Sequence, residues 1–262
     1  MPFPDSPRVI YEKNPLVEVI CAINFPAILR IDSEVPARYQ ERLKELYPLF
    51  SENQASNIKL NVAPEIAQII GSNQSLSFRG RATYSFVSAD KQWKVNLSRD
   101  SLSLSTRIYE RWEDFKEHLR EPLNALIEEY KPTFFSRIGL RYQDVIERSK
   151  LGLADCSWGQ LLEPHLAGEL SSPDIAEDIL SCVNQLVLAL DDGESRVLLN
   201  HGFASNQDNE ICYLIDSDFF TEERTETNNV IQKLDYFNRQ SGRLFRWCIN
   251  EKLHEALNPK SL

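Results

Sequence analysis

The chain has 262 residues, of which 42% are hydrophobic and 26% charged, which is typical of a globular protein with a substantial core. Its 39 acidic and 29 basic residues give a formal net charge of −10. Nucleic-acid binders and proteins of anionic membrane surfaces concentrate lysine and arginine, and this chain has no such run. The composition therefore argues against binding to nucleic acid or to a membrane.

Cysteine usage and the N-terminal sequence indicate the compartment. Five cysteines are widely spaced and include no C-x-x-C pair, which argues against a disulfide framework and a structural zinc site. The N-terminus lacks the charged and apolar regions of a secretory signal, and no stretch approaches the roughly 20 apolar residues of a membrane span. We expect a cytoplasmic protein with reduced thiols, without a bound metal or cofactor.

The first half of the chain predicts a strand, a short helix, a β-meander and a long helix. The expected elements are a strand ended by Pro26 (17–25), a short helix (37–50), weak strand signals (58–62 and 66–70), three meander strands (84–106) and a long helix containing Pro122 (109–130). On the first strand, Val17, Val19, Cys21 and Ile23 are expected to share the core face.

The second half repeats this order of elements. It predicts a strand (134–146), a short helix (158–170), three strands (182–190, 196–200 and 210–216), a hairpin turn (191–194) and a long helix (227–257) with a bend at Ser241 and Gly242. We therefore expect an α+β fold of two similar halves, 1–131 and 132–262, each an antiparallel sheet with a short helix and a long helix packed on it. The halves form either two domains or one continuous unit.

The strand at the centre of the chain carries the clearest charged pattern. Arg137, Gly139 and Arg141 alternate with Ile138, Leu140 and Tyr142, so the two arginines share one face. Their charges need a carboxylate, an anion or water. We favour cross-strand ion pairing, with Glu18 as the first candidate partner, over binding of an anionic ligand.

Asp216 and Asp218 form a second candidate site, just past the end of an expected strand. Such a pair could hold Mg²⁺ together with substrate phosphates. No glycine-rich phosphate loop accompanies them and no third carboxylate has a convincing spacing. We favour the simpler interpretation, a strand end that leads into a turn.

No catalytic constellation is visible in the sequence. The four histidines are scattered, none lies in an H-E-x-x-H motif, and no G-x-S-x-G or Walker-type loop is present. The four tryptophans fall on expected core stripes, where packing explains them. We assign no catalytic residue, and this disfavours an enzyme.

Several motifs together resemble one known family. They are Pro15-Leu16-Val17-Glu18-Val19, the segment from Tyr109 to Phe115, Arg137-Ile138-Gly139-Leu140-Arg141-Tyr142, Asp216-Ser217-Asp218-Phe219, and Leu244-Phe245. In combination they resemble the sporadically distributed, functionally uncharacterised prokaryotic family of about this length. The resemblance implies a bacterial or archaeal accessory gene, and it implies no activity and no catalytic residues.

These observations favour a non-enzymatic, protein-binding accessory module, inhibitor-like or chaperone-like, with a protein partner and room for a homodimer. The alternative is a phosphate-ligand-binding protein or a metal-dependent enzyme that uses Arg137, Arg141, Asp216 and Asp218. Together with Glu18, these four are the candidate ligand-binding residues.

Overall fold

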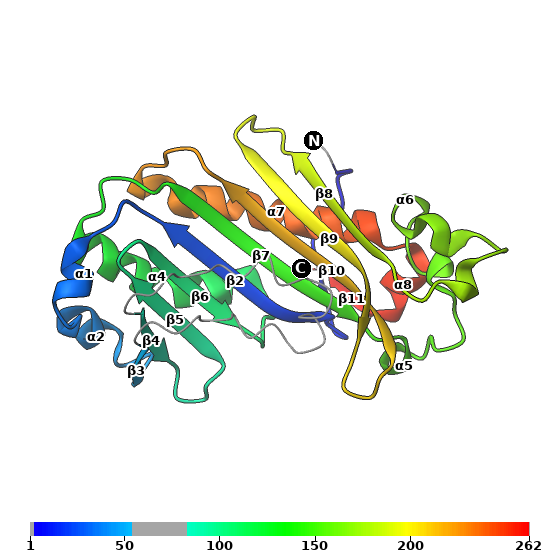
Figure 1. Ribbon diagram of the computed structural model, residues 1–262, viewed down its shortest axis with the longest axis horizontal. Coiled ribbons are helices and arrows are strands. Elements are labelled where there is room, and N and C mark those ends of the chain that lie inside the picture. The colour runs from blue at the N-terminus through cyan, green and yellow to red at the C-terminus, as the bar shows by residue number, and fades with distance from the viewer. Residues whose placement is uncertain (1–2, 54–82, 262) are drawn as a thin grey trace.

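The computed structural model describes residues 3–53 and 83–261, which form a mixed α+β fold around an antiparallel sheet (Figure 1). Nine strands lie in the order β3 (Leu49–Asn53), β4 (Thr83–Val87), β5 (Trp93–Ser98), β6 (Ser101–Thr106), β2 (Leu16–Asn24), β7 (Arg137–Ile146), β10 (Ile211–Thr221), β9 (Ser195–Ser205) and β8 (Val183–Ala189). A separate two-stranded sheet pairs β1 (Val9–Tyr11) with β11 (Pro259–Ser261) and joins segments near both ends of the chain.

Two long helices, α4 (Trp112–Tyr130) and α7 (Val230–Cys248), lie against the same face of the sheet, behind it in Figure 1. The shorter helices are α1 (Leu29–Ser33), α2 (Ala37–Leu43), α5 (Arg148–Leu151), α6 (Pro164–Ala167) and α8 (Glu251–Ala256), with 3₁₀ turns at Trp158–Gln160, Gly168–Ser171, Ala176–Asp178 and Thr227–Asn229. Within the described residues, no helix combines the length and apolar character needed to cross a bilayer.

The main core lies between the sheet and the long helices. Val19, Cys21 and Ile23 alternate along β2 and are fully buried there, while Leu234 and Phe237 recur at helical spacing on α7. We call this side the helix-covered face of the sheet, and the opposite side the second face.

The two halves of the chain place their strands in the same order. β6 returns beside β2 in the first half and β10 returns beside β7 in the second, and a long helix follows each. β2 and β7 pair with each other at the centre, so the sheet runs without interruption across the expected boundary between 131 and 132.

The expected helix over 37–50 is wrong in its second part. α2 ends at Leu43, and Phe50 belongs to strand β3. Pro48 explains the difference, because proline removes a backbone donor and disfavours the helical conformation in the residue before it. The weak strand signals over 58–62 and 66–70 lie outside the described residues.

The expected strand over 210–216 is too short, because β10 continues to Thr221. Its polar residues remain in the ladder since β10 pairs along its length with both β7 and β9. Asp216 and Asp218 therefore lie inside a central strand, and placing them in a turn beyond it is wrong. The hairpin turn at 191–194 is confirmed between β8 and β9.

Both helices expected in the second half are divided. The segment 158–170 breaks at Pro164, the first residue of α6, and at Gly168, whose φ is +47°. The closing helix breaks at Ile249, and Asn250 starts α8 by accepting a hydrogen bond from the Leu253 amide at 3.1 Å. α7 passes through Ser241 and Gly242 without a break.

One core assignment on β2 is also wrong. The pairing with β7 shifts by a residue between Leu16 and Glu18. This irregularity turns Leu16 toward the main core, whereas Val17 packs with Val145 in a small cluster of its own.

Candidate functional site

Arg137, Arg141, Asp216 and Asp218 converge on the second face of the sheet, where we call them the arginine–aspartate ladder. Arg141 donates two hydrogen bonds to Asp216, at 2.7 Å from Nε and 2.6 Å from Nη2. Arg137 donates to Asp218 through Nη2 at 2.7 Å. The expected pairing of these arginines with carboxylates is confirmed.

Strand register explains which partners are chosen. Arg141 lies opposite Asp218, and Gln143 lies opposite Asp216, so each arginine reaches its carboxylate diagonally along β7. Arg137 reaches Asp218 by lying flat over Gly139. Its guanidinium also sits 5.0 Å from the centre of the Phe220 ring.

Glu18 is not the partner of either arginine. It lies opposite Gln143 on β2 and makes no ion pair within the described part of the chain. Burial raises the pKa of its carboxyl, an effect that Arg107 and Arg141 oppose. The prediction that Glu18 is the first partner is wrong because Asp216 and Asp218, within the strand, lie closer to the arginines.

The ladder neutralises its own charges. The Asp216 side chain is 1% exposed and the Arg141 side chain 14% exposed, so the pair is largely removed from water. Burial raises the pKa of Asp218, with Arg137 and Arg141 opposing that rise. Each carboxylate already holds a guanidinium, which is the arrangement of structural cross-strand pairs rather than of open metal or phosphate ligands.

Three other side chains, Glu147, Glu210 and Cys212, lie close enough to share a metal ion. However, Glu210 already accepts hydrogen bonds from the Ser149 amide and hydroxyl, at 2.9 and 2.5 Å. Burial raises the pKa of the Cys212 thiol to about 12, which disfavours the thiolate that a metal requires. The cluster serves to hold the β9–β10 connection against α5.

The described histidines pack against aromatic rings. His201 Nδ1 lies 2.7 Å from the Tyr213 hydroxyl, and His254 Nδ1 lies 2.8 Å from that of Tyr11. His118 stacks on Trp93 and His165 on Trp247, with ring centres 3.8 and 3.9 Å apart. These contacts explain the histidines as packing residues.

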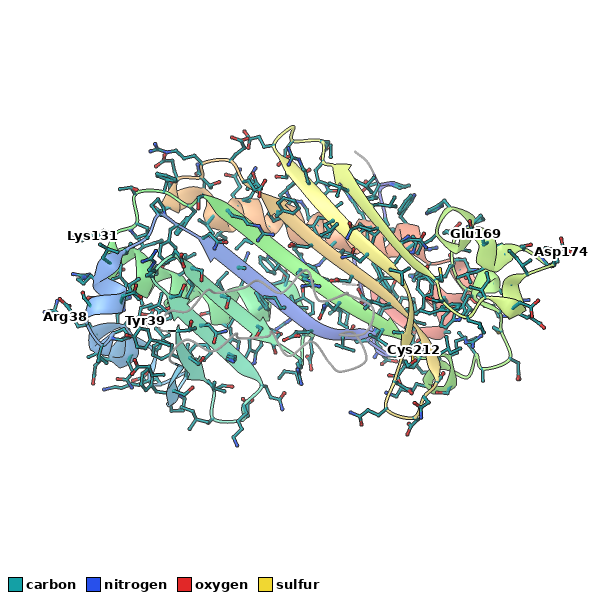
Figure 2. The ribbon with its side chains drawn as sticks, viewed as in Figure 1. Arg38, Tyr39, Lys131, Glu169, Asp174 and Cys212 are labelled. Carbon is teal, nitrogen blue, oxygen red and sulfur yellow. The ribbon has the colours of Figure 1, made fainter. Side chains whose placement is uncertain are left out.

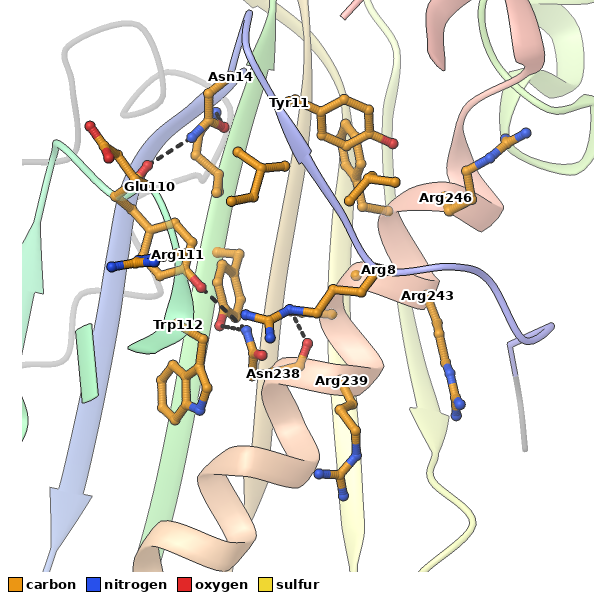
Figure 3. A pocket seen from close by; sticks show the side chains of 18 of the residues that line it. Arg8, Tyr11, Asn14, Glu110, Arg111, Trp112, Asn238, Arg239, Arg243 and Arg246 are labelled. Carbon is orange, nitrogen blue, oxygen red and sulfur yellow. Dashed lines mark hydrogen bonds between the residues drawn. The ribbon is translucent and has the colours of Figure 1, made fainter. Parts of the chain in front are cut away.

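A cavity of about 510 Å³ lies on the helix-covered side, between the sheet, α7, the start of α4 and the N-terminal segment (Figure 3). Its floor includes Tyr142 and Asp144 from β7, and its rim includes Arg8 and Arg239. The one sign of this cavity in the sequence is the polar residue Asp144 on the otherwise apolar face of a strand. A charged residue at a position where the alternation predicts an apolar one could have indicated the cavity.

Four exposed apolar residues lie in or shortly before strand β8, which forms one edge of the sheet. Figure 1 shows the position of β8 at this edge. The residues are exposed by 93% at Leu180, 61% at Val187, 58% at Val183 and 41% at Leu186. None of the seven residues of β8 is charged. Edge strands are normally protected by charges, prolines or bulges, and β8 has none of these.

Alternate backbone groups of β8 point away from the sheet. The Phe203 amide donates to Cys182 O at one end of the β8–β9 ladder, and the Leu190 amide donates to Ser195 O at the other. Antiparallel pairs alternate, so 184, 186 and 188 face β9, while the amides of 183, 185, 187 and 189 face outward. Within the described residues, no strand pairs with this outer side.

Acidic residues flank β8 at both ends. Asp174, Glu177 and Asp178 are exposed before it, and Asp174 projects at the end of the molecule in Figure 2. After the strand come Asp191, Asp192 and Glu194, of which the last two share a single lysine, Lys233. An uncharged apolar strand thus lies between two negative clusters.

No family model, curated protein or solved structure matches this chain. The geometry of the ladder, the cavity and the β8 edge therefore carries the functional argument.

Proposed function

We propose that this chain is a non-enzymatic protein-binding module that receives an extended segment of a partner protein along the β8 edge. The observation that carries the proposal is an uncharged edge strand whose outward amides pair with no described strand and whose apolar side chains are exposed. A partner strand would satisfy the backbone groups of 183, 185, 187 and 189 and cover Val183 and Val187. Exposed apolar patches of this kind mark interaction sites.

The charges around β8 favour a partner of particular chemistry. A second copy of the chain, paired antiparallel through β8, would bring Glu177 and Asp178 of one copy close to Asp191 and Asp192 of the other. Like charges at such an interface are unfavourable. The fitting partner segment is therefore apolar at its centre, with lysine or arginine at each end. A homodimer through β8 is an alternative that the experiment below distinguishes.

The proposal is tested by site-specific photo-crosslinking in the native host with the flanking genes present. A photoreactive amino acid replaces Leu180, and the matched control position is Arg38, an exposed residue at the far end of the molecule (Figure 2). We expect a partner protein to be crosslinked from Leu180 and not from Arg38. Mapping the crosslinked peptide should identify a segment with an apolar centre and basic flanks.

A backbone substitution distinguishes strand addition from non-specific hydrophobic binding. Val187→Pro removes an outward amide and leaves the bonds to β9 in place, whereas Val187→Thr keeps the amide. Crosslinking from Leu180 should be lost with proline and retained with threonine. Equal crosslinking by both variants would contradict strand addition, and a crosslink only to a second copy of the chain would replace the proposed partner by a homodimer.

The same proposal includes the origin of the fold. The matching strand order of the two halves supports an internal duplication, in which β2 corresponds to β7 and α4 to α7. The resemblance to the sporadically distributed prokaryotic family supports a place in a prokaryotic accessory gene system, and the widely spaced cysteines support a cytoplasmic location. In that setting an inhibitor-like or chaperone-like module would bind the product of a neighbouring gene.

A further inference from the structure

The cavity beside α7 is independent of the β8 edge and has the features of a small-molecule site. Its volume, about 510 Å³, is that of pockets that enclose cofactor-sized ligands. Five aromatic residues line it: Tyr11, Tyr109, Trp112, Tyr142 and Phe245. Such walls offer flat surfaces against which a planar ring can stack.

The floor of the cavity carries an unpartnered carboxyl group. Asp144 is 6% exposed, faces the cavity from β7, and has no hydrogen bond or ion pair with any described residue. Burial raises the pKa of this carboxyl well above its usual range, an effect to which the charge of Asp216 adds. Two N–H donors from a ligand would favour the ionised form of Asp144.

The rest of the floor is held in place by a polar network. Asn238 on α7 donates to the Tyr142 hydroxyl at 2.9 Å and to the Tyr109 hydroxyl at 3.3 Å. The two tyrosine rings meet edge to face, 5.7 Å apart. These contacts fix the wall next to Asp144, whose carboxyl makes no hydrogen bond with any described residue.

Basic residues outnumber acidic ones in the lining of the cavity, although the protein as a whole is acidic. Six basic side chains line it against four acidic ones; the basic residues are Arg8, Arg111, Lys116, Arg239, Arg243 and Arg246. Five of the six are held in ion pairs: Arg8 with Glu113, Arg111 with Asp114, Lys116 with Asp235, Arg243 with Asp5 and Arg246 with Glu251. Arg239 is exposed on α7 and has no ion pair within the described residues (Figure 3).

We propose that this cavity binds a planar nitrogen heterocycle that carries a phosphate or carboxylate, with paired N–H groups of the ring on Asp144 and the anion on Arg239. Guanine and pterin rings present such a pair of donors, and arginine offers a fork of donors to an anion. A simple cationic amine fits less well, because it would leave the positive charge of Arg239 without a counter-charge. A ligand of this kind would lie between the sheet and the N-terminal segment.

The test is isothermal titration of the full chain with guanosine 5′-monophosphate and, separately, with folic acid. Guanosine, which lacks the anion, and adenosine 5′-monophosphate, which lacks the paired donors, are the ligand controls. Asp144→Asn should weaken binding by roughly tenfold to a hundredfold, the usual cost of a lost bidentate contact. Arg239→Gln should weaken it by up to about fivefold, as for an exposed ion pair.

The matched control is Arg38→Gln, which removes an exposed arginine of α2 that lies outside the cavity and has no ion pair among the residues that the structure describes. This substitution should leave binding unchanged. Arg239→Gln keeps the test decisive if Asp144→Asn fails to fold, since Arg239 is exposed. The proposal is overturned if neither ligand binds at millimolar concentration. It is also overturned if adenosine 5′-monophosphate binds as tightly as the guanosine nucleotide, or if binding survives both cavity substitutions unchanged. None of these results bears on crosslinking at β8.

Discussion

The guanidinium of Arg137 occupies the space above Gly139 that any larger side chain at this position would fill. A Cβ atom at residue 139 would collide with the tip of Arg137, which is the end that binds Asp218. Glycine between the two arginines of β7 is therefore part of the ladder: it lets Arg137 lie flat on the sheet and reach its partner. The relationship makes Gly139 the simplest point at which to test the ladder.

Gly139→Ala should displace Arg137 and lose its pair with Asp218. Because the Arg137 and Asp218 side chains are 21% and 23% exposed, the loss should be modest. We expect about 1–2 kcal/mol in urea unfolding, as for a charged hydrogen bond that is partly screened by water. In an Asp218→Asn background the same substitution should cost less. An equal cost in both backgrounds would show that alanine acts by some route other than the ladder.

The Arg141–Asp216 pair is more deeply buried and should respond more strongly. Arg141→Ala should cost about 3 kcal/mol or more, because it leaves the Asp216 carboxylate without its partner in a low-dielectric site. The double variant Arg141→Met with Asp216→Leu should recover much of that loss, since an apolar pair leaves no buried charge. Chemical denaturation of Arg141→Ala, of the single variants Arg141→Met and Asp216→Leu, and of their double measures both effects. Strictly additive losses would contradict direct pairing.

His201 predicts a stability change in mild acid. Burial lowers its pKa from 6.5 to about 4, with His165 adding to the effect, so the folded chain resists protonation there. Between these pH values the unfolded chain binds the proton and the folded chain does not, so stability falls as the pH falls. The loss should approach about 3 kcal/mol by pH 4.

The pH profile of His201→Gln isolates this contribution from all other titrating groups. The stability difference between the native chain and the variant should shrink steadily from pH 7 to pH 4. Parallel profiles over that range would mean that His201 titrates normally in the fold.

Asp144 predicts the opposite pH trend. Its pKa lies well above the usual value of 3.8 because the carboxyl is buried. Above pH 3.8 the unfolded chain releases this proton and the folded chain retains it, so the contribution of Asp144 to stability is lost as the pH rises toward its folded pKa. Asp144→Asn should therefore gain stability relative to the native chain as the pH increases from 4 to 7. A gain that does not vary with pH would contradict the raised pKa.

Sequence patterns predicted the elements that depend on local alternation. The meander of β4, β5 and β6 and the buried faces of β2 and β7 follow from apolar residues at every second position. The strand order that joins them could not be predicted, because pairing of β2 with β7 depends on contacts more than a hundred residues apart.

The sequence predicts that the arginines of the ladder form cross-strand ion pairs, but it does not predict that their partners are Asp216 and Asp218. The alternation of Arg137 and Arg141 indicates cross-strand ion pairs. The polar residues after Asp216 suggest that the strand ends there, whereas β10 continues to Thr221. The pairing register between β7 and β10 determines which aspartate each arginine reaches. No local sequence pattern predicts the register between strands that are distant in the chain. The cavity depends on the tertiary placement of the N-terminal segment against α7, which lies far from it in the chain.

The most direct measurement of strand addition at β8 is amide hydrogen exchange, residue by residue, in the free chain and with the crosslinked partner bound. In the free chain the amides of Asn184, Leu186 and Leu188 should exchange slowly and those of Val183, Gln185, Val187 and Ala189 quickly. In the complex the second group should slow to the level of the first. Continued fast exchange of these four amides in a stable complex would contradict the central claim.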